Sequence, residues 1–176
     1  MSGFKKFVGL LIGLVMFGTV FPALFYLASR ALDDQLGFSP VFNAPNSIFA
    51  AAFALLIGLF WVTWAYSYIH FVGKGSPVEA FGVALYPTQK LITTGPYAYT
   101  RNPMVLGYMF ILLGIAFIGN SVSGFALVLI LALLAVLYLR RFEESALIRR
   151  FGDKYIAYKK VVPLLIPTLK PRTPPA

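Results

Sequence analysis

Long apolar segments alternate with short polar ones along this chain of 176 residues. No charged residue interrupts the run from Phe7 to Ser29, and none occurs between Ser47 and Gly73. Each run is long enough for a helix to cross a bilayer core roughly 30 Å thick. A signal peptide has an apolar core of only about 7–15 residues, so the first run predicts an uncleaved span. We therefore expect two N-terminal spans within residues 1–73, joined by a polar loop from Arg30 to Asn46.

The next uncharged run extends from Asn102 to Leu139. As one straight helix this run would be about 57 Å long, which is too long for a single crossing. Gly119-Asn120-Ser121 lies in its middle, and these are residues typical of a turn. The pattern predicts a helical hairpin over residues 103–140, which brings the number of transmembrane helices to four.

Positive charge is distributed unevenly between the two sides of these spans. Lysine and arginine exceed the acidic residues in the N-terminal segment, in the loop from Lys74 to Asn102 and in the tail from Arg140, whereas the loop from Arg30 to Asn46 has a slight acidic excess. Basic residues accumulate on the cytoplasmic side of membrane proteins. The expected fold is therefore all-α: a polytopic membrane protein with four transmembrane helices, both termini inside (N-in/C-in) and a cytoplasmic C-terminal helix.

The amino-acid composition also indicates a membrane protein and argues against a soluble domain. The chain is 59% hydrophobic and 12% charged, whereas a soluble domain has about 25% charged residues. It has no cysteine and one histidine, His70, so we expect neither a thiolate nucleophile nor a metal site. The net charge of +9 follows the topology, which indicates contact with membrane lipids and not with nucleic acid.

A polar corner, Gly95-Pro96-Tyr97-Ala98-Tyr99-Thr100-Arg101-Asn102-Pro103, precedes the hairpin. Gly-Pro indicates a turn, and Asn102-Pro103 predicts a helix that begins at Pro103 with Asn102 as its N-cap. Arg101 has two interpretations: it anchors the helix at lipid headgroups, or it binds a carboxylate or phosphate. The tyrosines are interfacial anchors or ring faces for a cation.

The tail has the second polar constellation. Glu143 and Glu144 open a charged helix with an apolar face at Leu147, Phe151, Tyr155 and Tyr158, and Gly152 is expected to divide that helix. The two carboxylates are either solvated and paired with nearby arginines or engage a cationic ligand. Because the hairpin returns the chain to its starting side, we expect the corner and the tail to be neighbours.

The order and spacing of these motifs resemble isoprenylcysteine carboxyl methyltransferases and their bacterial relatives, which grade into phospholipid methyltransferases. The resemblance covers roughly residues 75–167: the corner through Gly107, then Glu143-Glu144, Phe151-Gly152, Val162-Pro163 and Ile166-Pro167. We expect one membrane domain over 1–176, in which the apolar runs give the two spans at 1–73 and the Pro-rich residues 168–176 form a disordered tail. The resemblance implies a methyltransferase-like core at 74–167. The resemblance to bacterial members implies a bacterial inner membrane location, and the distribution of positive charge predicts that the active site faces the cytoplasm.

The resemblance further implies S-adenosylmethionine as cofactor and an amphiphilic or lipid-like acceptor. Arg101, Glu144 and Arg140 are expected to orient the acceptor. The implied cofactor contacts are Lys90, Leu91, Ile92, Tyr97, Asn102, Pro103, Met104 and Glu143.

Three positions depart from the family pattern. Asn102 replaces the histidine of eukaryotic members, Val105 replaces a tyrosine, and Leu139 replaces an arginine that meets the substrate. The last departure weakens the case for a prenylcysteine carboxylate as acceptor. Two alternatives to a methyltransferase remain at this point: an inactive scaffold or partner subunit of the same fold, and a sterol-reductase-like enzyme that uses NADPH.

Overall fold

The computed structural model describes residues 11–74, 79–80, 83–84 and 88–174. The first residues of the expected N-terminal span, 7–10, lie outside the described residues. The helical elements, in chain order, are η1 (Met16–Val20), α2 (Phe21–Leu36), α3 (Ala44–Phe71), η2 (Gly95–Ala98), α4 (Pro103–Gly119), α5 (Val122–Tyr138), η3 (Leu139–Glu143), α6 (Glu144–Phe151) and α7 (Asp153–Val161). A two-residue antiparallel pair joins β1 (Glu79–Ala80) to β2 (Val83–Ala84).

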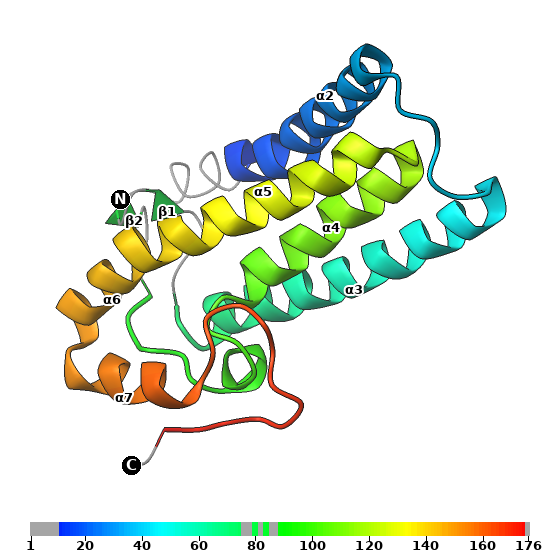
Figure 1. The fold of residues 1–176 in the computed structure, drawn as a ribbon. Helices are drawn as coiled ribbons and strands as arrows, with labels where there is room; N and C mark the ends of the chain where they lie inside the picture. The colour runs from blue at the N-terminus through cyan, green and yellow to red at the C-terminus, as the bar shows by residue number, and fades with distance from the viewer. Residues whose placement is uncertain (1–10, 75–78, 81–82, 85–87, 175–176) are drawn as a thin grey trace. The chain divides into compact units, whose positions relative to one another are not determined.

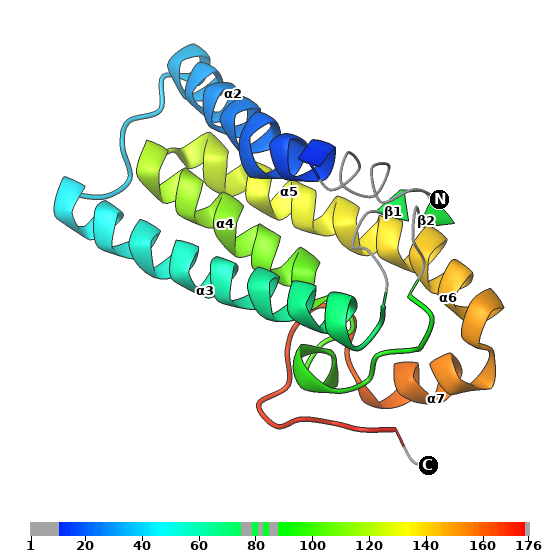
Figure 2. The same cartoon turned by 180° about the vertical axis from the view of Figure 1, so that it is seen from behind.

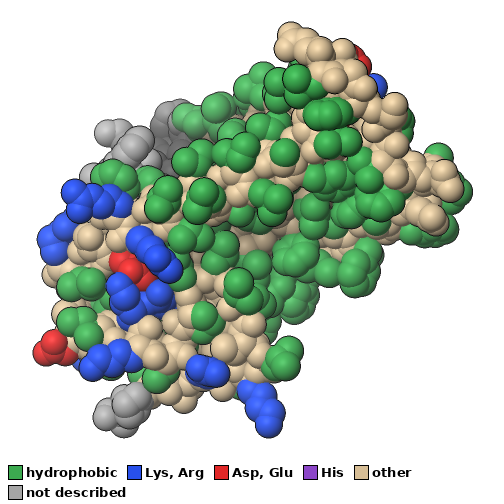
Figure 3. All heavy atoms as spheres, viewed as in Figure 1, with side chains coloured by type: hydrophobic (Ala, Val, Ile, Leu, Met, Phe, Trp, Pro, Cys, Tyr) green, Lys and Arg blue, Asp and Glu red, His purple; other side chains and the backbone are tan. Residues whose placement is uncertain are grey.

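Three helical stretches among the described residues are long and apolar enough to cross a membrane: Leu11–Leu36, Ala44–Phe71 and Val122–Phe151. The fourth expected span, α4, is apolar but has only 17 residues. Large apolar side chains along these stretches are well exposed, among them Leu14 at 67%, Phe49 at 74% and Leu129 at 73%, and Figure 3 shows hydrophobic side chains over the long helices. Such surfaces are stable against lipid and not against water, so the protein is an integral membrane protein.

The chain divides into two compact units, and the division falls within α3, α4 and α5. Unit 1 comprises Met1–Leu59 and Tyr108–Leu133. Its core contains the buried side chains of Phe25, Leu112, Ala116 and Val128.

The hairpin turn of unit 1 lies where the sequence predicts a break, because α4 ends at Gly119 and α5 begins at Val122 (Figure 1). Asn120 occupies the left-handed region with a φ of 47°, which asparagine tolerates better than most residues. Its side chain accepts hydrogen bonds from the backbone N–H groups of Val41 and Phe42 and donates one to the Phe42 carbonyl.

The expectation of a loop from Arg30 is wrong, because α2 continues to Leu36. Within unit 1, Arg30 donates a hydrogen bond to the Gly119 carbonyl at 3.3 Å. The buried Asp33 carboxylate accepts one from the Ser123 N–H at 2.9 Å, at the start of α5. The Gly119 carbonyl at the end of α4 and the Ser123 N–H at the start of α5 are backbone groups that a helix end leaves without an intrahelical partner. The side chains of Arg30 and Asp33 supply these partners, and the contacts stabilise the part of α2 beyond Arg30.

Unit 2 comprises Phe60–Gly107 and Leu134–Ala176. Its core contains the buried side chains of Tyr155, Tyr158 and Val162, with Leu147 and Phe151 packed against them. Gly152, with a φ of 55°, separates α6 from α7. The apolar face expected along the tail therefore packs inside this unit, together with Leu91 from the segment before the corner.

Candidate functional site

The corner at residues 95–103 forms a tight turn followed by a helix start. Gly95–Ala98 is a single 3-10 turn, and Gly95 has a φ of 60°, a conformation that favours glycine. Pro103 is the first residue of α4, and the Asn102 carbonyl accepts a hydrogen bond from the Leu106 N–H at 3.0 Å. Asn102 thus occupies the predicted N-cap position.

Aromatic side chains from the end of α3 pack on this corner. A Cβ placed on Gly95 would lie 2.2 Å from Cζ of Tyr68, so the tyrosine ring lies directly against the glycine backbone. The Tyr99 ring contacts both tryptophans, with centroids 6.4 Å from Trp61 and 5.8 Å from Trp64. Aromatic side chains from the end of α3 therefore hold the corner in place.

A C-terminal strap, residues 163–172, hydrogen-bonds along the other side of the corner. The Pro163 carbonyl accepts from the Arg101 N–H at 2.9 Å, and the Thr168 N–H donates to the Tyr99 carbonyl at 3.0 Å. The Asn102 side chain donates to the Leu164 carbonyl at 3.0 Å, so its amide binds the strap. Figures 1 and 2 show the strap beside the corner from opposite sides.

A buried ion cluster joins the corner to the tail. Arg101 Nη2 lies 2.7 Å from Glu144 Oε1, and Lys159 Nζ lies 2.5 Å from Glu144 Oε2. The side chains of Arg101 and Glu144 are only 8% and 5% exposed. The arginine contact is an ion pair without hydrogen-bond alignment, and the Nε and Nη1 groups of Arg101 have no hydrogen-bond partner among the described residues.

Three tyrosines of unit 2 lie near the charged side chains of the corner and the tail. Burial raises the pKa of Tyr97 well above its usual range, and the negative charge of Glu143 raises that pKa further. Burial likewise raises the pKa of Tyr155 and of Tyr158. The Tyr158 hydroxyl donates to the Tyr97 carbonyl at 2.7 Å, which connects α7 to the corner. All three phenols are therefore neutral at physiological pH.

All the residues predicted for the site belong to unit 2. Ile92, Asn102, Pro103 and Glu144 are buried, Leu91, Tyr97, Met104 and Glu143 are half-buried, and Lys90 and Arg140 are exposed. The structure brings Arg101 to Glu144 and Tyr97 near Glu143.

Some of the predicted site residues lack a polar contact with the other predicted residues in the described part of the chain. Within the described part of the chain, Lys90, Met104 and Arg140 make no side-chain hydrogen bond or ion pair with another predicted site residue. No group of three or more metal-ligating side chains occurs among the described residues. The hollow lined by Asp153, Ile156, Ala157, Lys160 and Val161 on α7 includes none of the predicted residues.

The sequence interpretation missed four partners: Tyr68, Lys159, Leu164 and Thr168. The Leu164 carbonyl and the Thr168 N–H are backbone groups that almost every residue has, so these contacts leave no residue-type signal. Lys159 follows Glu144 by fifteen positions, across the break at Gly152, so helical periodicity does not pair them. Nothing in the sequence pattern relates Tyr68, near the end of an apolar run, to Gly95.

Comparison with known proteins identifies relatives of this chain. The sequence model described as "Phospholipid methyltransferase" matches residues 46–154. No solved structure shows significant similarity to the chain.

Three curated proteins illustrate the likeness. Protein-S-isoprenylcysteine O-methyltransferase of Schizosaccharomyces pombe is 38% identical over 87 residues, covering 45% of this chain and 34% of the relative. The Mus musculus protein of that name is 33% identical over 87 residues, covering 47% and 29%. Methanethiol S-methyltransferase 2 of Bradyrhizobium diazoefficiens is 30% identical over 125 residues, covering 65% and 46%. The matched region is thus less than half the length of each relative.

Proposed function

The chain belongs to the phospholipid methyltransferase family, whose sequence model matches more than half of it, and we propose that it is an integral membrane methyltransferase that uses S-adenosylmethionine. One observation in the structure supports the proposal most directly. The corner and the tail, which carry the family resemblance, meet in unit 2 through Arg101 and Glu144 at 2.7 Å and through Tyr158 and Tyr97 at 2.7 Å.

The chemistry of these side chains fits the methyl donor. When bound, S-adenosylmethionine supplies a methyl group carried by a positively charged sulfur. The Glu143 carboxylate and the ring of Tyr97 favour positive charge beside them. The first N–H groups of α4 and the buried Arg101 guanidinium favour a carboxylate. Lys90, Leu91, Ile92, Asn102, Pro103 and Met104 complete the proposed donor site.

These residues act mainly by positioning. Methyl transfer is an in-line displacement, so the rate depends on holding two groups in register more than on moving protons. The hydrogen bonds from the strap to Tyr99, Arg101 and Asn102 hold the corner in one conformation. Burial raises the pKa values of Tyr97 and Tyr158, so both phenols stay neutral and no phenolate competes with the acceptor for the methyl group.

We propose an amphiphilic, lipid-like acceptor that enters from the bilayer. Leu139 is buried at 2% exposure, so the position where relatives have a substrate-binding arginine offers no charge here. Arg140, the next residue, is exposed and remains available to orient a polar headgroup. This arrangement suits a lipid headgroup better than a prenylcysteine carboxylate.

We also propose that α4 is a fourth crossing and that both termini face the cytoplasm of a bacterial inner membrane. With 17 residues, α4 would extend about 26 Å, close to the hydrocarbon thickness. The excess of lysine and arginine in the tail supports the orientation.

The test is donor binding by the full chain in lipid nanodiscs. Isothermal titration with S-adenosylhomocysteine, the demethylated product, should give saturable binding, and NADPH should give none. Glu143→Gln should weaken that binding, whereas Asp153→Asn, an exposed acid in the same tail, should leave it unchanged. Absence of binding by both S-adenosylmethionine and its product would refute the proposal. Mass spectrometry of lipid extracts incubated with labelled donor would then identify the acceptor.

A further inference from the structure

The C-terminal strap presents large apolar side chains that lie outside the long helices. Ile166 is 81% exposed and Leu169 is fully exposed, three positions further along the chain. The strap itself has no helix or strand. Single exposed apolar residues need no explanation, but two on one short segment indicate a contact surface when the charge around them also points to a partner.

The backbone of the strap is fixed on the corner, so these side chains keep their outward direction. The Thr168 N–H donates a hydrogen bond to the Tyr99 carbonyl at 3.0 Å, and the Arg172 N–H donates one to the Ala98 carbonyl at 2.8 Å. Pro167, between the two exposed residues, further restricts the backbone. A surface held in one conformation loses little conformational entropy when a partner covers it.

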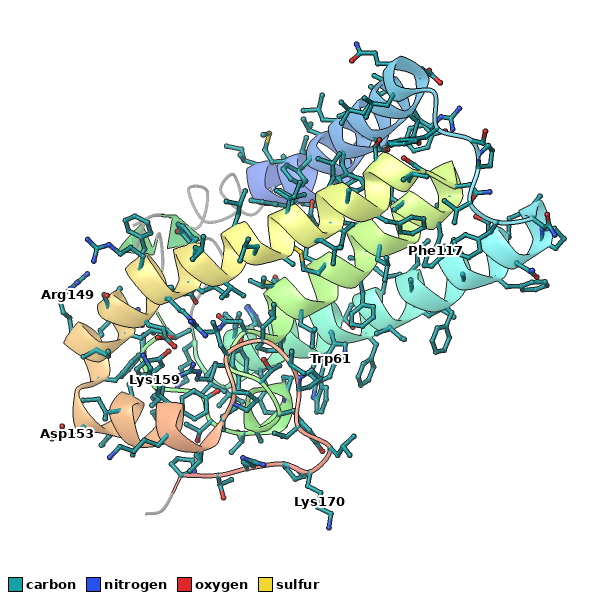
Figure 4. All side chains as sticks on the ribbon, viewed as in Figure 1. Trp61, Phe117, Arg149, Asp153, Lys159 and Lys170 are labelled. Atoms are coloured by element: carbon teal, nitrogen blue, oxygen red, sulfur yellow. The ribbon has the colours of Figure 1, made fainter. Side chains whose placement is uncertain are left out.

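The charge around the strap has one sign. From residue 154 to residue 176 the chain has no acidic residue, and its five basic residues are Lys154, Lys159, Lys160, Lys170 and Arg172. Lys170 and Arg172 are exposed residues of the strap itself, and Figure 4 shows Lys170 directed away from α7. Apolar side chains beside lysine and arginine are typical of segments that lie on an anionic membrane surface.

Contacts within unit 2 favour lipid over a water-soluble partner. Thr168, the neighbour of Leu169, is bonded to Tyr99, and the Tyr99 ring contacts Trp61 and Trp64 of α3. The helix α3 is long and apolar enough to cross a membrane. Because tryptophans near the end of a span are typical of the membrane–water interface, the strap is connected to residues expected at that depth.

We propose that the strap is a membrane contact separate from the spans. Ile166 and Leu169 enter the interfacial region of an anionic bilayer, and Lys170 and Arg172 contact its lipid headgroups. The strap thereby ties the corner to the membrane surface, since its hydrogen bonds hold the backbone of residues 98–101. This contact goes beyond the proposed function and requires no methyl donor.

The test measures whether lipid or water surrounds position 169. The chain has no cysteine, so a cysteine introduced at one position carries a fluorescent label at that position alone. Leu169→Cys is compared with Asp153→Cys, an exposed position at the start of α7 (Figure 4). Each labelled full chain is placed in nanodiscs of phosphatidylcholine alone or of phosphatidylcholine and phosphatidylglycerol in equal amounts. The readout is the ratio of quenching by a nitroxide on the lipid acyl chain to quenching by acrylamide in water.

In the anionic nanodiscs the label at position 169 should be quenched mainly by the lipid nitroxide, and the label at position 153 mainly by acrylamide. Adding Lys170→Gln should lower the ratio at position 169 by about 5-fold, the effect of one basic residue at an anionic surface. Lys154→Gln, an exposed lysine at the start of α7, should leave the ratio unchanged. In phosphatidylcholine alone Lys170→Gln should have no effect.

A further variant tests the apolar part of the contact. Adding Ile166→Ser should lower the ratio at position 169 by roughly 10-fold in both lipids, because burial of an apolar side chain does not depend on lipid charge. Ile166 and Lys170 are exposed, so these substitutions should leave the chain folded. Emission from the two tryptophans, which both contact Tyr99, checks that the corner is intact.

Three results would overturn the proposal. If acrylamide reaches positions 169 and 153 equally in both lipids, the strap lies in water. If the label at position 169 is shielded from acrylamide and also from the lipid nitroxide, protein covers the strap. If Lys170→Gln and Lys154→Gln have the same effect, the strap does not recognise anionic headgroups.

Discussion

Replacing Gly95 with alanine should disrupt the corner through two separable effects. Gly95 has a φ of 60°, and a Cβ at this position would lie 2.2 Å from Cζ and 2.4 Å from Cε1 of Tyr68. The left-handed conformation costs a residue with a Cβ about 1–2 kcal/mol. The collision forces the Tyr68 ring away from the glycine and from Trp64, which lies 6.5 Å away between ring centroids. Overpacking of this kind costs about 1–3 kcal/mol. The free energy of unfolding should therefore fall by about 2–5 kcal/mol in total.

The chain contains its own control and its own probe. Gly37 has a φ of 71°, and a Cβ there would have nothing within 4 Å, so Gly37→Ala isolates the backbone cost. The two tryptophans of the chain, Trp61 and Trp64, both contact Tyr99, so their fluorescence reports on the corner. Unfolding by sodium dodecyl sulfate in mixed micelles, followed by this emission, measures both variants on one scale.

A second substitution tests the steric part directly. In a Tyr68→Ala background, the additional cost of Gly95→Ala should shrink to that of Gly37→Ala, because the ring is absent. Gly95→Ala should also weaken S-adenosylhomocysteine binding, since the turn leads into Tyr97 and Asn102. If Gly95→Ala unfolds like Gly37→Ala and binds with wild-type affinity, the reasoning about the Tyr68 contact is wrong.

Three further expectations concern stability in the same micelle assay. Tyr158→Phe removes the 2.7 Å hydrogen bond to the Tyr97 carbonyl, so the free energy of unfolding should fall by about 1–2 kcal/mol. S-adenosylhomocysteine binding should also weaken, and no change in either quantity would contradict this expectation. Because burial raises the pKa of Tyr97, Tyr155 and Tyr158, the folded chain holds these protons more tightly than the unfolded chain, whose phenols titrate near about pH 10. Stability should then be unaffected by these groups below about pH 9 and should fall above about pH 10, and a rise in that range would refute the assignment. Asn120→Ala removes the hydrogen bonds to residues 41–42 and places an alanine at a φ of 47°, so the free energy of unfolding should fall by about 2–4 kcal/mol. Asn120→Gly should lower it by about 1 kcal/mol less, because glycine accepts that φ.

The sequence was sufficient for the helical class and for several element boundaries, because those depend on local chemistry. Apolar runs of membrane-spanning length predict the long helices, and Pro103 begins α4 as the Asn-Pro pair indicates. Gly119-Asn120-Ser121 lies at the turn between α4 and α5 for the same reason. The extension of α2 to Leu36 was not predicted, since it depends on partners about 90 residues away, at Gly119 and Ser123.

The roles of individual side chains in the corner required the tertiary structure. Asn102 occupies the predicted N-cap position, yet its amide binds the carbonyl of Leu164. Thr168, in a segment expected to be disordered, hydrogen-bonds to Tyr99. A backbone carbonyl has the same chemistry in every residue, so no sequence pattern identifies which one an amide will meet.

The ion cluster of Arg101, Glu144 and Lys159 was predicted in part from the sequence and required the tertiary structure for the rest. Arg101 and Glu144 could be singled out from the sequence because their residue types are unusual next to apolar spans, and the topology favoured their proximity. Lys159 was one of several basic residues in the tail, and nothing in its spacing distinguished it from Lys160. The fold distinguishes them because α7 turns Lys159 towards Glu144 and leaves Lys160 in solvent. Charge and hydropathy are properties of residues along the chain, whereas the pairing of buried charges depends on distances that only the folded chain sets.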